Sequence, residues 1–165
     1  MNSEPRFPTV RMRRLRSHPA IRSLLTRNRL HPANLVLPLF VCPGEGIRQP
    51  ITAMPGQEQL STDMLVEQAR ECHQLGIGGI ILFGIPENKD ERGSHALSSD
   101  GIVQQALRAV KSEVPELLLI SDICFCEYTD HGHCGVLHEQ GGRTEVDNDA
   151  TLALLAEQAL THAQA

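Results

Sequence analysis

The residues best suited to chemistry lie in one short segment of the chain. Within eleven residues the sequence places three thiols and two imidazoles, on Cys124, Cys126, Cys134, His131 and His133. Zinc prefers thiolate and imidazole ligands, and a loop can bring such residues to one ion. Three thiolates leave the fourth tetrahedral position open for water or substrate. The pattern therefore favours a Lewis-acid site over a closed structural one.

Other interpretations of these residues stay open at this level. The thiols could be unligated and partly buried, but burial explains an isolated cysteine better than a cluster in a polar loop. Asp122 directly precedes the cluster, where it could orient a cationic group or bond to a neighbouring loop. Cys42 and Cys72 lie on apolar patterns and are expected to pack in the core. His162 has no chemical neighbours in sequence, so a surface or capping role is expected.

Alternating apolar runs and helical periodicity predict the elements that position this segment. Residues 35–41, 77–83 and 117–123 are apolar enough to be strands buried on both faces. Pro38 weakens the first strand, because it lacks one backbone donor. A Gly/Pro-rich stretch, 42–56, follows that strand.

Three helices are predicted to follow the three strands. The first begins after Ser61 and ends near Gly76, and the second ends before Pro115. The third begins near Asp149, and its predicted buried face consists of Leu152, Leu155 and Ala159.

This alternation predicts an α/β protein built from parallel units with right-handed crossovers. No Gly-x-Gly-x-x-Gly turn follows the first strand, so a (β/α)8 TIM barrel is favoured over a doubly wound sheet. Such a barrel needs about 250 residues. The 165-residue chain would therefore hold only about its first three βα units.

The net charge is -5, and the charged residues are unevenly distributed along the chain. Residues 1–30 carry eight arginines and one acid, a charge of +7, and the remainder carries seven basic and nineteen acidic side chains, a charge of -12. The arm has little aromatic content and no zinc-finger spacing, which favours self-association over nucleic-acid binding. The sequence contains no apolar run near the roughly 18 residues of a membrane span. With five cysteines and no signal peptide, a cytoplasmic location is expected.

The segment 122–135, Asp-Ile-Cys-Phe-Cys-Glu-Tyr-Thr-Asp-His-Gly-His-Cys-Gly, resembles the metal-binding segment of the delta-aminolevulinic acid dehydratases, also called porphobilinogen synthases. Further stretches resemble that family in the same order, namely 8–16, 37–41, 54–56 and 82–86. The resemblance thus extends over nearly the whole chain.

This resemblance implies a hydro-lyase that condenses two 5-aminolevulinate molecules into porphobilinogen with loss of water, on the route to haem. It implies a (β/α)8 barrel assembled as a homo-octamer, with residues 1–33 as an oligomerisation arm and 34–165 as the N-terminal part of the barrel. The implied zinc loop is 122–135. Its implied zinc ligands are Cys124, Cys126 and Cys134, with Asp122 near the substrate amino group and His133 near the metal or on a second one. An allosteric Mg2+ is expected only in sequence beyond residue 165.

The same resemblance implies two lysines that form Schiff bases with the substrate ketones. The chain has only Lys89, in the loop after the second strand, and Lys111, on the outer face of the second helix. Neither precedes a proline after an apolar strand, as the family's lysines do, so the chain is expected to be an inactive N-terminal portion. The alternative is a small zinc-binding adaptor whose basic arm contacts RNA or an acidic partner. Strands covered on both faces argue against it, because three helices on one side cannot cover both.

Overall fold

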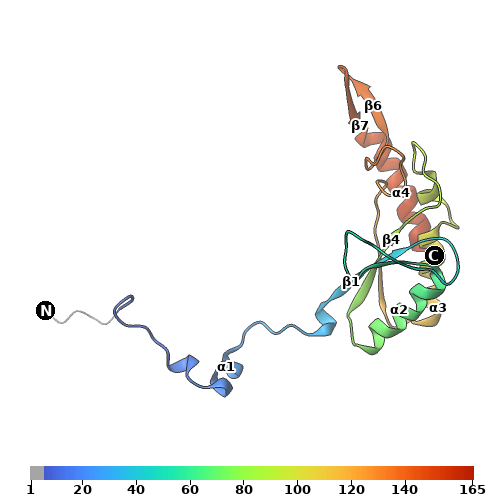
Figure 1. Ribbon diagram of the computed structural model, residues 1–165. Helices are drawn as coiled ribbons and strands as arrows, with labels where there is room; N and C mark the ends of the chain where they lie inside the picture. Colours follow the sequence, from blue (N-terminus) through green and yellow to red (C-terminus); the bar gives the residue numbers. More distant parts are fainter. Residues whose placement is uncertain (1–5) are drawn as a thin grey trace. The chain divides into compact units, whose positions relative to one another are not determined.

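The computed structural model describes residues 6–165, apart from the side chain of Gln140, and the chain forms two compact units that meet between His31 and Pro32 (Figure 1). The first unit contains the short 3-10 helix η1 (Arg14–Arg16) and helix α1 (Pro19–Leu25), neither with a buried residue. Helix α1 begins at Pro19, where the fixed proline φ suits a first helical turn. Nδ1 of His18 caps it by accepting the Ala20 amide at 3.2 Å. The role of the predicted arm in assembly stays a prediction.

The second unit is built on a five-stranded sheet in the order β2-β3-β1-β4-β5. All neighbouring pairs are parallel except β2 with β3. The strands are β1 (Val36–Val41), β2 (Arg48–Pro50), β3 (Glu58–Leu60), β4 (Gly79–Gly84) and β5 (Leu118–Ser121). The remaining elements are the 3-10 helices η2 (Pro32–Asn34) and η3 (Ser94–Leu97), the helices α2 (Thr62–Gln74), α3 (Ile102–Glu113) and α4 (Asn148–Gln164), and the hairpin strands β6 (Leu137–Gln140) and β7 (Arg143–Val146). The predicted α/β class is confirmed.

The sheet of the described residues is open rather than closed. It ends at β2 on one side and at β5 on the other, so residues 6–165 form no closed barrel, and the expected partial (β/α)8 barrel stays a prediction. Strands β2 and β3 lie in or near the stretch that the sequence presents as a Gly/Pro-rich loop. Because β3 pairs with β1 only at Phe40 and Val41, β1 has a free edge at Pro38, which is where a strand tolerates proline.

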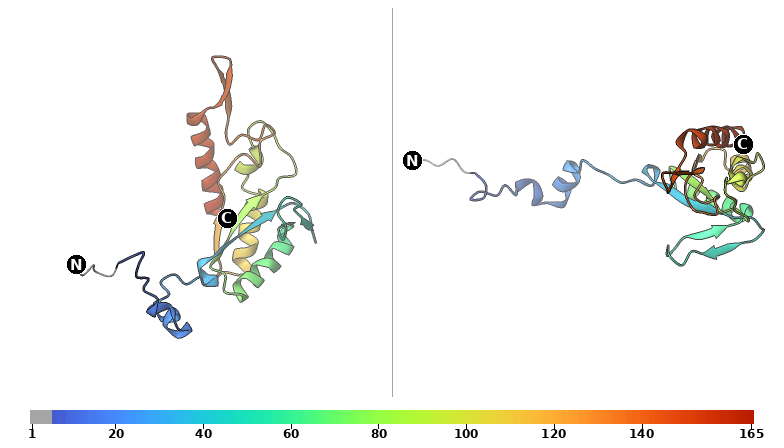
Figure 2. Two further views of the ribbon diagram at one scale, coloured as in Figure 1. Left: turned by 60° about the vertical axis from the view of Figure 1, so that its left-hand side comes forward. Right: turned by 90° about the horizontal axis from the view of Figure 1, so that it is seen from above.

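The apolar core lies between one face of the sheet and helices α2 and α3, whose packing Figure 2 shows from two sides. Alternate strand residues face this core and are buried, for example Leu39 and Leu82, which pair across β1 and β4. The opposite face carries Phe40 and Phe83, whose rings stack with centroids 5.4 Å apart and stay only partly buried. Within the described residues the helices thus cover one face, and this part of the chain does not supply the cover for the second face that the apolar strands predict.

Helix α4 turns a different face inward from the one predicted. Of the predicted residues, Leu152 is 62% exposed, Ala159 is also exposed, and only Leu155 is partly buried. The buried residues are Thr151, Leu154, Gln158 and His162. The expected surface or capping role of His162 is likewise wrong. The apolar pattern predicts the wrong buried face of α4 because three of the four buried residues are polar. Their burial is compensated by hydrogen bonds to segments that are distant in the sequence.

None of the helices among residues 6–165 has the length and apolar character needed to cross a membrane.

Close packing at the end of β4 gives a first test of the fold. A Cβ added at Gly84 would overlap the Tyr128 hydroxyl and Cγ2 of Val103, and both of these residues are buried. We expect Gly84→Ala to lower the free energy of unfolding by about 1–3 kcal/mol, measured by urea denaturation. Adding Tyr128→Phe removes the nearest atom, so the double variant should lose less than the sum of the single losses. An unchanged midpoint for Gly84→Ala would contradict the close approach.

Candidate metal centre

The cysteine loop, residues 122–135, begins at the carboxyl end of β5. The amide of Asp122 donates to the Leu82 carbonyl oxygen at 3.1 Å, which extends the pairing of β5 with β4 by one residue. Because β1, β4 and β5 are parallel, their carboxyl ends meet at one edge of the sheet. Ligand sites of α/β proteins gather at this edge, so the loop lies where a site is expected.

A buried aromatic pair fixes the first turn of the loop. Phe125 is fully buried and Tyr128 nearly so, in a cluster with Ala96 and Leu154. The Phe125 carbonyl oxygen accepts the amides of Tyr128 and Thr129, both at 2.9 Å. Cys124 and Cys126 flank Phe125 in sequence, so burial of the ring determines where both cysteines lie.

The three predicted sulfur ligands come together around Cys124. Its Sγ lies 3.1 Å from Sγ of Cys126 and 3.1 Å from Sγ of Cys134. All three are free thiols, and these distances far exceed the roughly 2.05 Å of a disulfide bond. The Phe125 amide donates to Cys134 Sγ at 3.3 Å, which ties the far end of the loop to its first turn.

A carboxylate that the sequence reasoning missed lies beside the thiols. Cys126 Sγ donates to Oε2 of Glu127 at 3.2 Å, and ligand atoms of Cys124, Cys126 and Glu127 all lie within 4.8 Å of one another. The sequence does indicate Glu127 as a candidate ligand, because it directly follows Cys126 and carboxylate oxygen is an ordinary zinc ligand. The donor set of soft thiols and one carboxylate fits a zinc-like cation.

Burial and negative charge act on the ionisable groups in the same direction. Burial raises the pKa of the Cys124 and Cys126 thiols, and the Glu127 charge adds to this effect. Burial also raises the pKa of Asp122, and Glu127 again contributes. Neutral forms are therefore favoured for these groups, and a bound cation would instead favour the charged forms.

Neither histidine ring of the loop is grouped with the sulfurs among the described residues. A ring nitrogen of His131, Nε2, is hydrogen-bonded to the Glu91 carbonyl oxygen at 3.1 Å, and the amide of His133 donates to His131 Nδ1 at 3.1 Å. Among the described residues, the group of clustered metal-binding atoms includes no histidine. Cys124, Cys126 and Glu127 thus form the clustered group of the candidate metal centre, and Cys134 lies outside this group but 3.1 Å from Cys124 Sγ.

The loop after β4 lies against the cysteine loop and supports it. Asp90 forms an isolated parallel bridge with Thr129, and the Asp130 amide donates to the Asp90 carbonyl oxygen at 3.1 Å. The Thr129 hydroxyl donates to the His133 carbonyl oxygen at 2.8 Å. Lys89, next to Asp90, and Lys111 on α3 are both exposed.

Comparison with known proteins gives a consistent picture. Residues 9–165 match the profile of the family described as delta-aminolevulinic acid dehydratase. The chain is 49% identical over 159 residues to the enzyme of that name from Synechococcus elongatus, covering 96% of this chain and 49% of the relative. It is 50% identical over 162 residues to the one from Streptomyces coelicolor, covering 96% and 48%.

A solved structure is also similar to this chain. It is the delta-aminolevulinic acid dehydratase (porphobilinogen synthase) of Toxoplasma gondii in complex with the reaction product porphobilinogen, with a TM-score of 0.87 and 36% identity. The match covers 94% of this chain and 44% of that one. The chain spans about half the length of the two curated relatives, at 49% and 48%. By sequence and by structure, this chain belongs to the delta-aminolevulinic acid dehydratase family.

Proposed function

We propose that this chain provides the metal-binding part of a porphobilinogen synthase, which condenses two 5-aminolevulinate molecules into porphobilinogen with loss of water. The observation that carries the proposal is the meeting of three thiols at the carboxyl edge of a parallel sheet. Family membership and the product named in the similar Toxoplasma gondii structure support the choice of reaction. The family match over residues 9–165 spans most of the arm and the whole sheet, which favours the enzyme over the alternative of a zinc-binding adaptor.

Cys124, Cys126 and Cys134 would hold Zn2+, with Glu127 beside them. When bound, the ion supplies a Lewis acid that polarises a substrate oxygen. The residues of this chain would hold the site in shape. Phe125 keeps Cys124 and Cys126 together through its burial, and its amide keeps Cys134 close to them.

Asp122 would orient the amino group of one substrate. It is only partly exposed at the end of β5, and both its burial and the nearby charge of Glu127 raise its pKa. An ammonium group beside it would favour the carboxylate form and be attracted to it. The carboxylate would thus bind the substrate more strongly once the amino group is charged.

Turnover would need groups that the described residues do not provide. Schiff-base formation requires an amine on a lysine whose pKa is lowered by burial or by a neighbouring cation. Lys89 and Lys111 are both exposed to solvent, so neither suits this role. We propose that the isolated 165-residue chain does not make porphobilinogen.

The remaining features fit the same function. The partly exposed sheet face around Phe40 and Phe83 would become the interior of a (β/α)8 barrel when further strands extend the sheet from β5. The arginine-rich first unit would contact other subunits of a cytoplasmic homo-octamer, for which the acidic remainder of each copy is a complementary surface. An allosteric Mg2+ would bind outside this chain.

Zinc content tests the ligand assignment. We expect the purified chain to retain about one zinc ion, and the triple variant Cys124→Ser, Cys126→Ser, Cys134→Ser to retain almost none, because the thiolates supply the binding free energy. Metal analysis after gel filtration measures both. Cys42→Ala is the matched control, since that thiol is buried outside the loop. Equal zinc content in the triple variant would show that the assignment is wrong.

Borohydride trapping tests the role of the lysines. With 5-aminolevulinate and borohydride, we expect mass spectrometry to find no stoichiometric adduct on Lys89 or Lys111, and a colorimetric assay to find no pyrrole. The Synechococcus elongatus relative, of which this chain covers 49%, is the positive control. A stoichiometric adduct on either lysine together with turnover would refute the proposed inactivity.

A further inference from the structure

Helix α4 buries a polar stripe where an amphipathic helix normally buries apolar side chains. Thr151, Gln158 and His162 are 5%, 0% and 7% exposed, whereas Leu152 and Leu160 on the same helix are 62% and 57% exposed. Buried polar groups cost free energy unless they are hydrogen-bonded. The partners of this stripe therefore indicate what it does.

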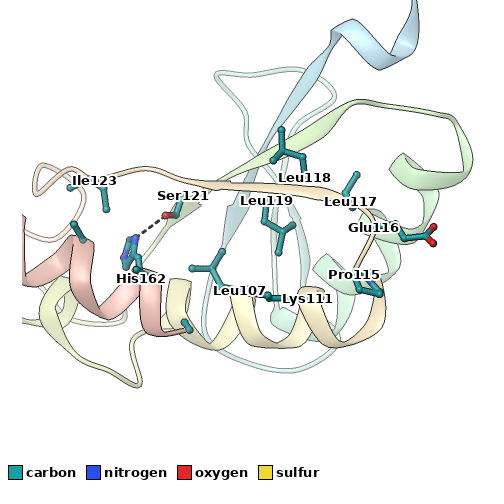
Figure 3. A pocket seen from close by; sticks show the side chains of 13 residues that line it. Leu107, Lys111, Pro115, Glu116, Leu117, Leu118, Leu119, Ser121, Ile123 and His162 are labelled. Carbon is teal, nitrogen blue, oxygen red and sulfur yellow. Dashed lines mark hydrogen bonds between the residues drawn. The ribbon is translucent and has the colours of Figure 1, made fainter.

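All three polar side chains bond to the cysteine loop or to the residue at either end of it. His162 Nδ1 shares a hydrogen bond of 3.0 Å with Ser121 Oγ, just before the loop (Figure 3). Gln158 Nε2 donates to the Cys124 carbonyl oxygen at 3.4 Å. Thr151 Oγ1 accepts the amide of Val136 at 3.0 Å, just after the loop. The helix thus runs antiparallel to the loop and bonds to its start, its first cysteine and its end.

A glycine allows the closest of these approaches. Gly135 has φ +138°, a conformation that side chains other than glycine rarely adopt, and a Cβ there would overlap Oγ1 and Cγ2 of Thr151. Thr151 therefore packs directly against the backbone that follows Cys134. This contact restrains the far end of the loop next to the third sulfur.

The helix is itself held by contacts that do not involve the sulfurs. Gln104 of α3 is 1% exposed, and its Nε2 donates to Thr161 Oγ1 at 3.0 Å and to the Ala96 carbonyl oxygen at 3.2 Å. Leu154 packs in the cluster with Phe125. Within the described part of the chain Oε1 of Gln158 has no hydrogen-bond partner, so an apolar residue would be less costly there. Stability alone does not explain a glutamine at this position.

We propose that Thr151, Gln158 and His162 are positioning residues that hold the three thiols in place through the backbone at Val136 and Cys124 and through the Ser121 hydroxyl. Their hydrogen bonds go to Val136, Cys124 and Ser121 through atoms other than sulfur. They fix the carbonyl group of Cys124 and the residue after Gly135, so the relative positions of the first and third cysteines depend on α4. The consequence for metal affinity rests on the proposed function, whereas the effect on the loop itself does not. Groups that orient metal ligands typically contribute about 10–100-fold to affinity.

Two readouts on the full 165-residue chain test this proposal. The variants are Thr151→Val and Gln158→Met, which keep approximate size and remove the hydrogen-bonding group. The controls are Thr151→Ser, which keeps the hydroxyl, and Gln164→Met, an exposed glutamine of the same helix. Hydrogen–deuterium exchange of the metal-free chain reports on residues 121–136, and titration of Co2+ against a chromophoric chelator gives the metal affinity.

We expect faster exchange in residues 121–136 for both test variants, with β1 and β4 unchanged, and Co2+ affinity lowered about tenfold or more. Both controls should match the unsubstituted chain. Unchanged exchange and affinity in both variants would overturn the proposal. So would faster exchange spread equally over β1 and β4, because it would indicate a role in overall stability. If the unsubstituted chain bound no Co2+, the metal function would fail, and the exchange data would still decide whether α4 positions the loop.

Discussion

Burial of the Phe125 ring is the interaction on which the rest of the site depends. The ring is fully buried, and the backbone of Phe125 makes three hydrogen bonds inside the loop, one of them to Cys134 Sγ. Burying a phenylalanine side chain stabilises a fold by roughly 1.5–3 kcal/mol. That free energy offsets the cost of gathering three thiols, which otherwise gain little from lying close together without a cation. The packing of one residue therefore makes its two cysteine neighbours converge.

The sheet determines where this loop lies. Parallel pairing places the ends of β1, β4 and β5 at one edge, and the loop after β4 bridges to Thr129. Helix α4 then runs back along the loop from Val136 to Ser121. The cysteine loop is thus held from three directions, by the sheet, by a neighbouring loop and by a helix. Such support is needed wherever side chains must be preorganised for binding.

Much of this arrangement follows from the sequence, because it depends on local patterns. Apolar runs predicted the three main strands, and the residue types of the cysteine cluster predicted the candidate metal centre. Local patterns fail where a contact is made at long range. The buried face of α4 was misassigned because Gln158 and His162 find their partners more than thirty residues away, at Cys124 and Ser121. Glu127 was overlooked because its proximity to the thiols depends on the turn at Phe125.

The most direct test of the central claim is zinc-edge X-ray absorption on the full 165-residue chain loaded with one equivalent of Zn2+. If three thiols converge on one cation, the first shell should fit about three sulfur scatterers near 2.3 Å plus one lighter atom. A first shell made only of nitrogen and oxygen, or one with a single sulfur, would contradict the convergence of Cys124, Cys126 and Cys134 on one ion.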